Sequence, residues 1–370
     1  MTVKQGYKLT EVGVIPEDWA VKKMGDIAPL QRGFDLPTSQ LQEGIYPVVY
    51  SNGVLTRHNA FKVYAVGVVT GRSGTIGKIH YIAENYWPHN TTLWVTSFKD
   101  NSPKFIYYLY TFIKLERFGT GSGVPTLNRN DVHAYKSAIP PSIPEQTAIA
   151  NALSNADAYI NSLEQLIAKK QQIKQGTMQQ LLTGKKRLEG FSGEWKEAFI
   201  EDIAEITTGN KNTQDRVEDG VYPFFVRSQK IERINSYSFG CEAVVTAGDG
   251  VGTGKVFHYV HGKFDLHQRA YALYNFSEDV NGVFIFLIFK ESFFNRIMQM
   301  TAKSSVDSVR RDMIAKMKVI LPPLPEQTAI ANILTNMDND IQELQNKLTK
   351  AKQIKQGMMQ ELLTGKTRLI

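Results

Sequence analysis

The chain has one cysteine, Cys241, among its 370 residues, and no apolar run reaches transmembrane length. A single cysteine excludes an intramolecular disulfide and is typical of a reducing compartment. The first residues, Met1 to Gln5, lack the apolar core of a signal peptide. These absences predict a cytoplasmic protein that does not enter a membrane.

A complete phosphate-binding loop is also missing. Two glycine-rich stretches, 71–78 and 248–255, end in Gly-Lys. A P-loop needs a glycine five residues before that Gly-Lys and a Ser or Thr after it. The first position holds Arg72 in one stretch and Asp249 in the other, and the residue after the lysine is Ile or Val. We therefore expect loops between strands, facing a binding partner or purely structural.

Other catalytic signatures fail in the same way. The Pro-Pro pairs at 140–141 and 322–323 lack the preceding Asp or Asn and the following aromatic with which adenine methyltransferases hold a flipped base. The seven histidines and the one cysteine show no metal-binding spacing. No nucleophile stands beside an obvious base. The sequence predicts a chain without catalytic activity, metal or cofactor of its own.

What the sequence does contain is a long internal repeat. Residues 144–188 align with residues 325–369 at a constant offset of 181, without a gap, and 28 of the 45 aligned pairs are identical. A repeat of this length sets the architecture. It predicts a molecule with pseudo-two-fold symmetry.

Each copy of the repeat has the signals of one long helix. Pro144 and Pro325 suit the first helical position, and a glutamate follows each where the helix dipole is positive. Gly184 and Gly365 can adopt the left-handed conformation that ends a helix. Gly176 and Gly357 inside the copies are candidates for a kink or a close helix crossing.

Apolar residues alternate at spacings of four and three along both copies, which is a coiled-coil period. Lys170, Lys174 and Lys355 interrupt this seam. We expect the two helices to cover each other's seam, with antiparallel pairing natural and parallel pairing left open. The principal seam residues are Ile149, Leu153, Ile160, Leu163, Ile167, Ile330, Leu334, Ile341, Leu344 and Leu348.

The segments outside the repeat are related more faintly. Trp19 matches Trp195 at an offset of 176, and His89 matches His267 at 178. Both segments mix short β-branched and aromatic runs with aromatic-rich helical stretches. The runs at 46–50, 63–70, 243–246 and 256–260 predict strands, and the stretches at 103–118 and 283–300 predict helices. The predicted fold class is α/β, with two similar domains separated by two long helices. The domains are residues 1–142 and 187–323, and the helices are residues 143–186 and 324–370.

The net charge of +7 suits a nucleic-acid binder without establishing one. The charge is uneven along the chain. Residues 1–142 carry 15 Lys and Arg against 10 Asp and Glu, whereas residues 190–323 carry 16 against 17. The charge alone does not establish the function, because the second domain is nearly neutral overall.

Three motifs carry a resemblance. Residues 139–146 and 321–327 place a Pro-Pro pair just before Pro-Glu-Gln, residues 181–185 and 362–366 read Leu-Leu-Thr-Gly-Lys, and residues 10–19 read Thr-Glu-Val-Gly-Val-Ile-Pro-Glu-Asp-Trp. In these motifs, and in the order of its domains, the whole chain resembles the specificity subunit of type I restriction-modification systems.

The resemblance implies a subunit that binds double-stranded DNA, with each recognition domain reading half of a split site. It also implies two methyltransferase subunits as partners, with restriction subunits joining them. S-adenosylmethionine, ATP and magnesium are then expected in those partners. Two alternatives remain open on the sequence: the specificity subunit of a related two-part type II system, and a coiled-coil scaffold that binds no DNA.

Under this interpretation, the DNA contacts come from polar loops that differ between the two domains. Arginine and lysine can grip phosphate or read guanine, and Asn and Gln can pair with adenine. The candidates are Arg57, His58, Asn59, Arg72, Ser73, Lys78, His89, Asn90, Arg227, Gln229, Lys230, Lys255, Gln268 and Arg269.

Overall fold

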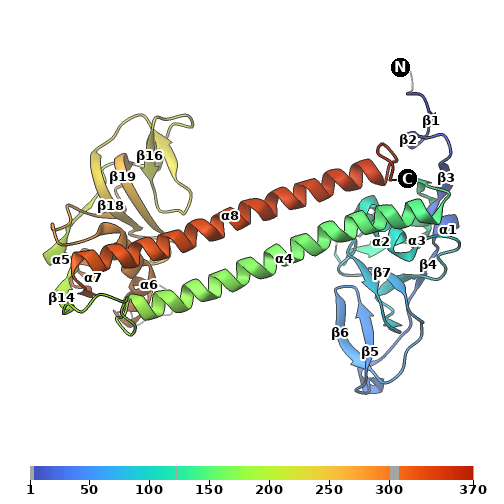
Figure 1. Cartoon of the computed structure of the whole chain (residues 1–370), viewed down its shortest axis with the longest axis horizontal. Coiled ribbons are helices and arrows are strands. Elements are labelled where there is room, and N and C mark those ends of the chain that lie inside the picture. The colour runs from blue at the N-terminus through green and yellow to red at the C-terminus, as the bar shows by residue number, and fades with distance from the viewer. Residues whose placement is uncertain (1–3, 122, 301–307, 370) are drawn as a thin grey trace. The chain divides into compact units, whose positions relative to one another are not determined.

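The computed structural model describes residues 4–121, 123–300 and 308–369, and it divides the chain into two compact units (Figure 1). Unit 1 comprises Met1–Gln165 and Gln345–Ile370, and unit 2 comprises Leu166–Leu344. Both boundaries fall inside the two long helices, α4 (Ile143–Leu181) and α8 (Leu324–Leu362). Each unit therefore contains one lobe and a segment of each helix. The sequence predicted four consecutive segments, whereas each compact unit combines one lobe with parts of both helices. Residues 1–3 and 370, at the ends of the first and last predicted segments, lie outside the described ranges.

Unit 1 is built on two small sheets. One has the strand order β4-β10-β7-β8 and the other β6-β5-β9, in which β5 and β9 run parallel. The strands are β1 (Tyr7–Thr10), β2 (Gly13–Pro16), β3 (Ala20–Lys23), β4 (Leu30–Arg32), β5 (Tyr46–Tyr50), β6 (Gly53–His58), β7 (Gly67–Gly71), β8 (Ile79–Ile82), β9 (Trp87–Pro88), β10 (Thr92–Val95), β11 (Gly119–Thr120), β12 (Thr126–Leu127) and β13 (Lys136–Ile139).

The buried face of α2 completes the core of unit 1. The helices besides α4 and α8 are α1 (Met24–Ile27), α2 (Pro103–Ile113) and α3 (Arg129–Ala134). α2 buries Phe105, Ile106 and Leu109 in the same cluster as Val68 of β7 and Leu153 of α4. The lobe and the first part of α4 thus share one core, which fixes the four-stranded sheet against that helix segment.

Unit 2 repeats this plan with longer strands. Its strands are β14 (Lys196–Phe199), β15 (Glu205–Thr208), β16 (Tyr222–Phe225), β17 (Glu232–Ile234), β18 (Phe239–Ala247), β19 (Phe257–Leu266), β20 (Ala270–Tyr274) and β21 (Lys318–Leu321). Its helices besides α4 and α8 are α5 (Ile200–Ile203), α6 (Gly282–Met300) and α7 (Arg311–Ala315).

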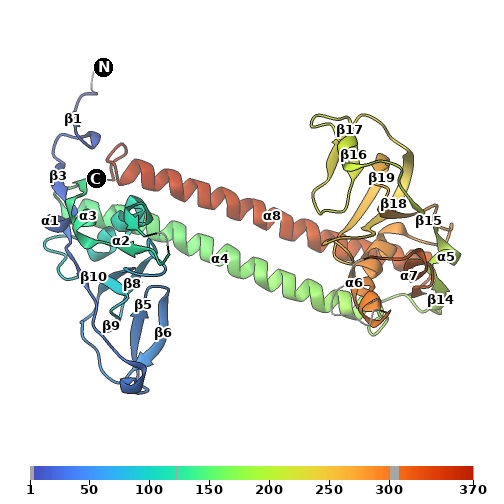
Figure 2. The same ribbon diagram turned by 180° about the vertical axis from the view of Figure 1, so that it is seen from behind.

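The strand order in unit 2 is β15-β20-β18-β19-β16-β17 (Figure 2). β19 is ten residues long, pairs antiparallel with β18 and runs parallel to β16. In unit 1 the same two pairings are made by separate strands, β8 with β7 and β9 with β5. The two-stranded antiparallel pairs β3–β13 and β14–β21, each of which joins the two ends of a lobe, also correspond. The two lobes are therefore copies of one α/β fold, as the faint sequence match indicated.

The ends of the long helices agree with the repeat, apart from one residue. Each helix has 39 residues and begins one position before the proline, at Ile143 and Leu324. Gly184 and Gly365 follow the last turns with φ of 69° and 73°, the left-handed conformation expected of them. A residue with a Cβ would be strained at either glycine.

The predicted seam is the buried side of both helices. Ile149, Leu153, Ile330 and Leu334 are fully buried. Ile160, Leu163, Ile167 and Ile341 are also buried, and Leu344 and Leu348 are half-buried. Since the seam is covered inside each unit by the lobe as well as by the other helix, its burial alone does not establish a coiled coil.

Ion pairs give the relative direction of the helix segments inside each unit. In unit 1, Lys355 pairs with Asp157 at 2.5 Å and Lys352 pairs with Glu164 at 2.7 Å. Residue numbers therefore fall along α8 in the direction in which they rise along α4. The segments are antiparallel. The equivalent of the first pair, offset by 181, is Lys174 with Asp338 in unit 2.

The same direction holds in unit 2, where Lys170 pairs with Asp340 at 2.9 Å and Lys174 with Asp338. The three lysines that interrupt the seam are thus not defects in it. Each reaches a carboxylate on the facing helix, and the ammonium groups stay at the edge of the apolar stripe.

Candidate nucleic-acid interface

The loops at one end of the unit 1 sheets come together. The backbone N–H groups of Arg72 and Ser73, which follow β7, donate to the Thr91 carbonyl at 2.8 and 3.2 Å. Lys78, before β8, donates its Nζ to the Asn52 carbonyl at 3.3 Å in the β5–β6 turn. The loops after β5, β7 and β9 are therefore fixed to one another.

His89 and Asn90 belong to this loop end as well. The His89 ring lies 4.4 Å from the Tyr50 ring, and burial lowers the pKa of His89 despite the nearby Asp35 carboxylate. Asn90 donates its amide to Asp35. Five of the predicted residues in the first domain, Arg72, Ser73, Lys78, His89 and Asn90, are thus gathered at one end of the sheets.

The other three candidates of the first domain lie at the far end of β6. His58 is 6% exposed, packs edge-on against Trp87 at 5.3 Å and contacts the Gln42 backbone. Arg57 pairs with Glu84 at 2.9 Å, which raises the pKa of Arg57. Asn59 donates to the Gln42 side chain. His58 has the surroundings of a core histidine, and the three side chains tie the end of β6 to residues 42–45 and to Glu84.

Unit 2 gathers its candidates around one carboxylate. Asp249, in the β18–β19 loop, accepts from Arg227 at 2.7 Å and from Arg269 at 3.1 Å. Partial burial opposes ionisation of Asp249, but the two arginines outweigh it and hold the pKa of Asp249 below its usual value. The loops after β16, β18 and β19 are therefore tied together by an Arg-Asp-Arg cluster.

The remaining candidates of unit 2 surround this cluster and are exposed. Lys230 pairs with Glu232 at 3.2 Å, and Gln268 donates to Asn212. Lys255 lies 5.9 Å from the Phe294 ring. Gln229 is exposed in the same loop as Lys230. All six predicted residues of the second domain thus lie in the three loops that meet at this end of the sheet.

The two loop ends are equivalent positions of one fold. Isolated bridges join Ser73 to Thr126 in unit 1 and Asp249 to Ser308 in unit 2. A second pair of bridges joins Phe34 to His89 and Lys211 to His267. The backbone scaffold is the same, and the side chains mounted on it differ.

The glutamates and glutamines of the repeat have roles that sequence reasoning missed. Glu145 is fully buried and accepts from Arg368 at 2.7 and 2.8 Å, and Arg368 also pairs with Asp18. In unit 2, Glu326 accepts from Arg187 in the same way. These glutamates anchor the end of the other helix copy to the lobe. The signal was present, since both arginines are identical positions of the repeat.

The neighbouring glutamines join the long helices to the lobes. Gln146 donates to the Pro140 carbonyl at 3.0 Å and accepts from the Ser102 amide at 2.8 Å. Gln327 repeats this with the Pro322 carbonyl and the Asn281 amide, at 2.8 and 2.9 Å. The Pro-Glu-Gln motif is therefore a structural junction in both units.

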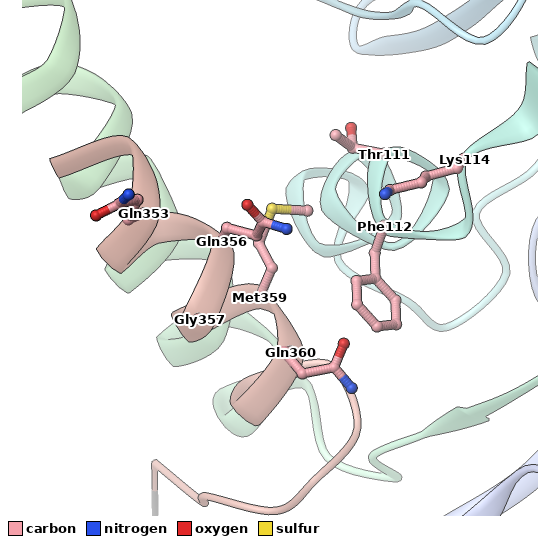
Figure 3. A pocket seen from close by; sticks show the side chains of 8 residues that line it. All are labelled: Thr111, Phe112, Lys114, Gln353, Gln356, Gly357, Met359 and Gln360. Carbon is pink, nitrogen blue, oxygen red and sulfur yellow. The ribbon is translucent and has the colours of Figure 1, made fainter. Parts of the chain in front are cut away.

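A hollow of about 660 Å³ lies beside α8 in unit 1, away from the loop end. Figure 3 shows Gln356 and Met359 of α8 directed toward α2, with Phe112 and Lys114 opposite. Gly357 lines it, and a Cβ there would meet no atom within 4 Å. Gly176 is equally unobstructed. Neither glycine is needed for a close helix crossing inside its unit.

Two classes of site are not found among the described residues. In residues 4–121, 123–300 and 308–369, no group of three or more His, Cys, Asp or Glu side chains is arranged to hold a metal ion. Within those same ranges, no helix is both long and apolar enough to cross a membrane.

The chain matches the family model described as the type I restriction modification DNA specificity domain, over residues 16–175 and 192–356. It is 27% identical over 171 residues to the type I restriction enzyme EcoDI specificity subunit of Escherichia coli, covering 46% of this chain and 37% of that protein. It is 22% identical to the MjaVIII specificity subunit of Methanocaldococcus jannaschii, covering 96% and 94%.

Solved structures show the same fold. The S subunit of a type I restriction-modification system from M. genitalium matches with a TM-score of 0.72 at 15% identity, covering 98% of both chains. A chain from a structure that addresses complex assembly and conformational transition of a type I system matches with a TM-score of 0.55 at 12% identity, covering 95% of this chain and 99% of that one.

Proposed function

Because the chain belongs to the type I restriction-modification DNA specificity family, we propose that it is the DNA-recognition subunit of such a system, with each lobe reading one half of a split DNA site. One observation carries this proposal. The two units hold the same three loops at the same strand ends, but with different polar side chains: Arg72 and Asn90 in one, and Arg227, Gln268 and Arg269 in the other. A common scaffold with two different surfaces suits two different half-sites.

The proposed contact set follows from the geometry of the loops. It keeps Arg72, Ser73, Lys78, His89 and Asn90 of unit 1 and all six candidates of unit 2. It leaves out Arg57, His58 and Asn59, since they lie at the opposite end of β6 from the gathered loops and His58 is buried. Guanidinium and carboxamide groups at these positions have the donors and acceptors that the major groove requires.

The long helices form the second part of the proposal. α4 and α8 each run from one unit into the other, so their length limits how the half-sites are spaced. We assign them the antiparallel coiled-coil arrangement, the pseudo-two-fold symmetry and the docking of two methyltransferase subunits, which restriction subunits then join. S-adenosylmethionine, ATP and magnesium belong to those partners, and this chain is non-catalytic and cytoplasmic.

The proposal is tested by sequencing the methylated bases of the host genome with this gene present and deleted. We expect one two-part adenine-methylated motif to disappear on deletion and to return on complementation. An unchanged set of methylated motifs would refute the proposal and favour a scaffold that binds no DNA. Purification with a restriction subunit separates a type I system from the related two-part type II system.

A further inference from the structure

Three arginines of unit 1 surround one hollow at the loop end. Arg32, Arg72 and Arg129 line a depression of about 290 Å³, and Leu93 and Leu127 contribute apolar surface to it. Arg32 and Arg129 were not among the residues expected from the sequence. The three arginines come from three separate places in the chain, which the fold brings together.

The sheet places Arg32 and Arg72 on either side of Leu93. Arg32 is paired with Leu93 across the β4–β10 ladder, and Leu93 is paired with Thr70 across β10–β7, two residues before Arg72. The Arg72 backbone is held at both groups, because its N–H donates to Thr91 and its carbonyl accepts from the Leu127 N–H at 2.7 Å. The backbone positions around the hollow are therefore fixed before any ligand arrives.

Arg129 lines the same hollow from α3. It is the first residue of α3, directly after the β12 segment that the Arg72 carbonyl binds. The Asn128 side chain caps this turn by accepting from the Asn130 N–H at 3.0 Å. The cap fixes the start of the turn that carries Arg129, and the bond from the Leu127 N–H to the Arg72 carbonyl joins this segment to the loop after β7.

Two of the three arginines at this hollow have no anionic partner among the described residues. No acidic residue lines it. Among the described residues, neither Arg72 nor Arg129 has an ion pair or a side-chain hydrogen bond. Arg32 pairs with Asp35 at 3.1 Å, but both side chains are more than half exposed, so the pair is weak and easily exchanged.

Unit 2 carries a carboxylate at a position of this loop where unit 1 has none. The bridges Ser73–Thr126 and Asp249–Ser308 make Ser73 and Asp249 equivalent. In unit 2 the carboxylate of Asp249 binds two arginines, whereas Ser73 offers unit 1 only a hydroxyl. The loop 71–78 of unit 1 therefore brings no carboxylate to the neighbourhood of Arg72.

We propose that the Arg32-Arg72-Arg129 hollow binds a phosphodiester group of the DNA backbone, so that unit 1 positions its half-site through a phosphate. This inference rests on the proposed function. A guanine edge takes up one arginine fork, whereas three arginines lining one depression can supply donors for the several acceptor oxygens of a phosphate. The surplus of basic residues in the first domain is consistent with this role.

The test measures DNA affinity against salt concentration for the full chain in complex with its methyltransferase subunits. Arg72→Ala and Arg129→Ala should each weaken binding about tenfold, equally for cognate and scrambled duplexes. The slope of log K against log salt should become shallower by roughly 1. Lys22→Ala, which removes one positive charge from exposed β3, is the matched control and should change neither quantity.

Arg72→Lys separates phosphate from base contact. Lysine keeps the charge but loses the planar fork, so a phosphate site should retain the wild-type salt slope and most of the affinity. If Arg72 reads a base, both substitutions should weaken cognate binding alone and alter the methylated motif, which would overturn the inference. Unchanged salt slopes in both alanine variants, with the complex assembled and folded by circular dichroism, would also overturn it.

Failure of this inference is distinguishable from failure of the proposed function. If the wild-type complex shows no preference for cognate DNA, the proposed function itself is wrong. If the wild-type complex is specific and the alanine variants keep its salt slope, only the phosphate assignment is wrong.

Discussion

Replacing Arg368 should loosen the start of α4 in unit 1 and leave unit 2 intact. Arg368 is the main partner of Glu145, whose side chain is fully buried, and it makes two hydrogen bonds of 2.7 and 2.8 Å to that carboxylate. Arg368→Ala would leave the carboxylate buried without a countercharge. Breaking a buried pair in this way costs about 3–5 kcal/mol.

The expected magnitude lies at the low end of that range. The Arg368 side chain is 23% exposed, so water can partly replace it at Glu145. We expect a loss of about 3 kcal/mol, to which the half-exposed Asp18 pair contributes at most about 1 kcal/mol. Asp18→Asn should therefore have a small effect.

Hydrogen exchange measured by mass spectrometry gives the exchange rates of backbone amides in each unit separately. A loss of about 3 kcal/mol should speed exchange of the first turns of α4 about a hundredfold, while the first turns of α8 stay protected. Arg187→Ala should do the reverse with a smaller effect, because Trp195 Nε1 still donates to Glu326 at 3.3 Å. Trp19 Nε1 has no such partner among the described residues of unit 1.

A double substitution identifies the cause. If the stranded carboxylate causes the loss, adding Glu145→Gln to Arg368→Ala should restore part of the protection. Equal loosening of both units by Arg368→Ala, or no change in either, would refute the reasoning.

Three further predictions concern reading, spacing and pH. Arg269→Ala should weaken cognate binding by roughly 1–3 kcal/mol and relax one position of the motif if Arg269 reads a base, and a binding-site selection checks this. Four residues inserted at Gln171-Gln172, both exposed, add about 6 Å of helix, so the methylated motif should keep both halves and gain one or two unspecified positions. Burial lowers the pKa of His258 below 6.5, although the hydrogen bond to the Ser228 carbonyl acts in the opposite direction. Since the folded state binds this proton less readily than the unfolded state, the contribution of His258 to the stability of unit 2 is complete above pH 6.5 and is lost as the pH falls below 6.5. Urea unfolding at pH 7.5 and 5.5 should show a larger loss in wild type than in His258→Gln.

The sequence predicted two similar α/β lobes and two long helices because the repeat is long and its periodicity is strong. The helix ends, with glycines at positive φ, and the strand at 46–50 were predicted directly. The run at 63–70 became a strand only from Gly67 onward, since its first part joins the sheet through a single bridge at Val63. Local propensity cannot distinguish a ladder from a bridge.

The loop ends were harder to predict, because they form from segments far apart in the chain. His58 was an expected contact, but packing against Trp87 makes it part of the interior. Arg32 and Arg129 were not expected, since nothing in their local sequence places them beside Arg72. Tertiary pairing of β4, β10 and β7 decides which side chains share a surface.

The central claim, that each lobe reads its own half-site, is tested most directly by exchanging one lobe and sequencing the methylated bases. Residues 20–138 should be replaced by the corresponding lobe of another member of the family whose two-part motif is known. We predict that the half-site of the donor lobe appears while the other half-site and the type of methylated base stay as they were. A methylated motif in which both halves change together would contradict independent reading by the two lobes.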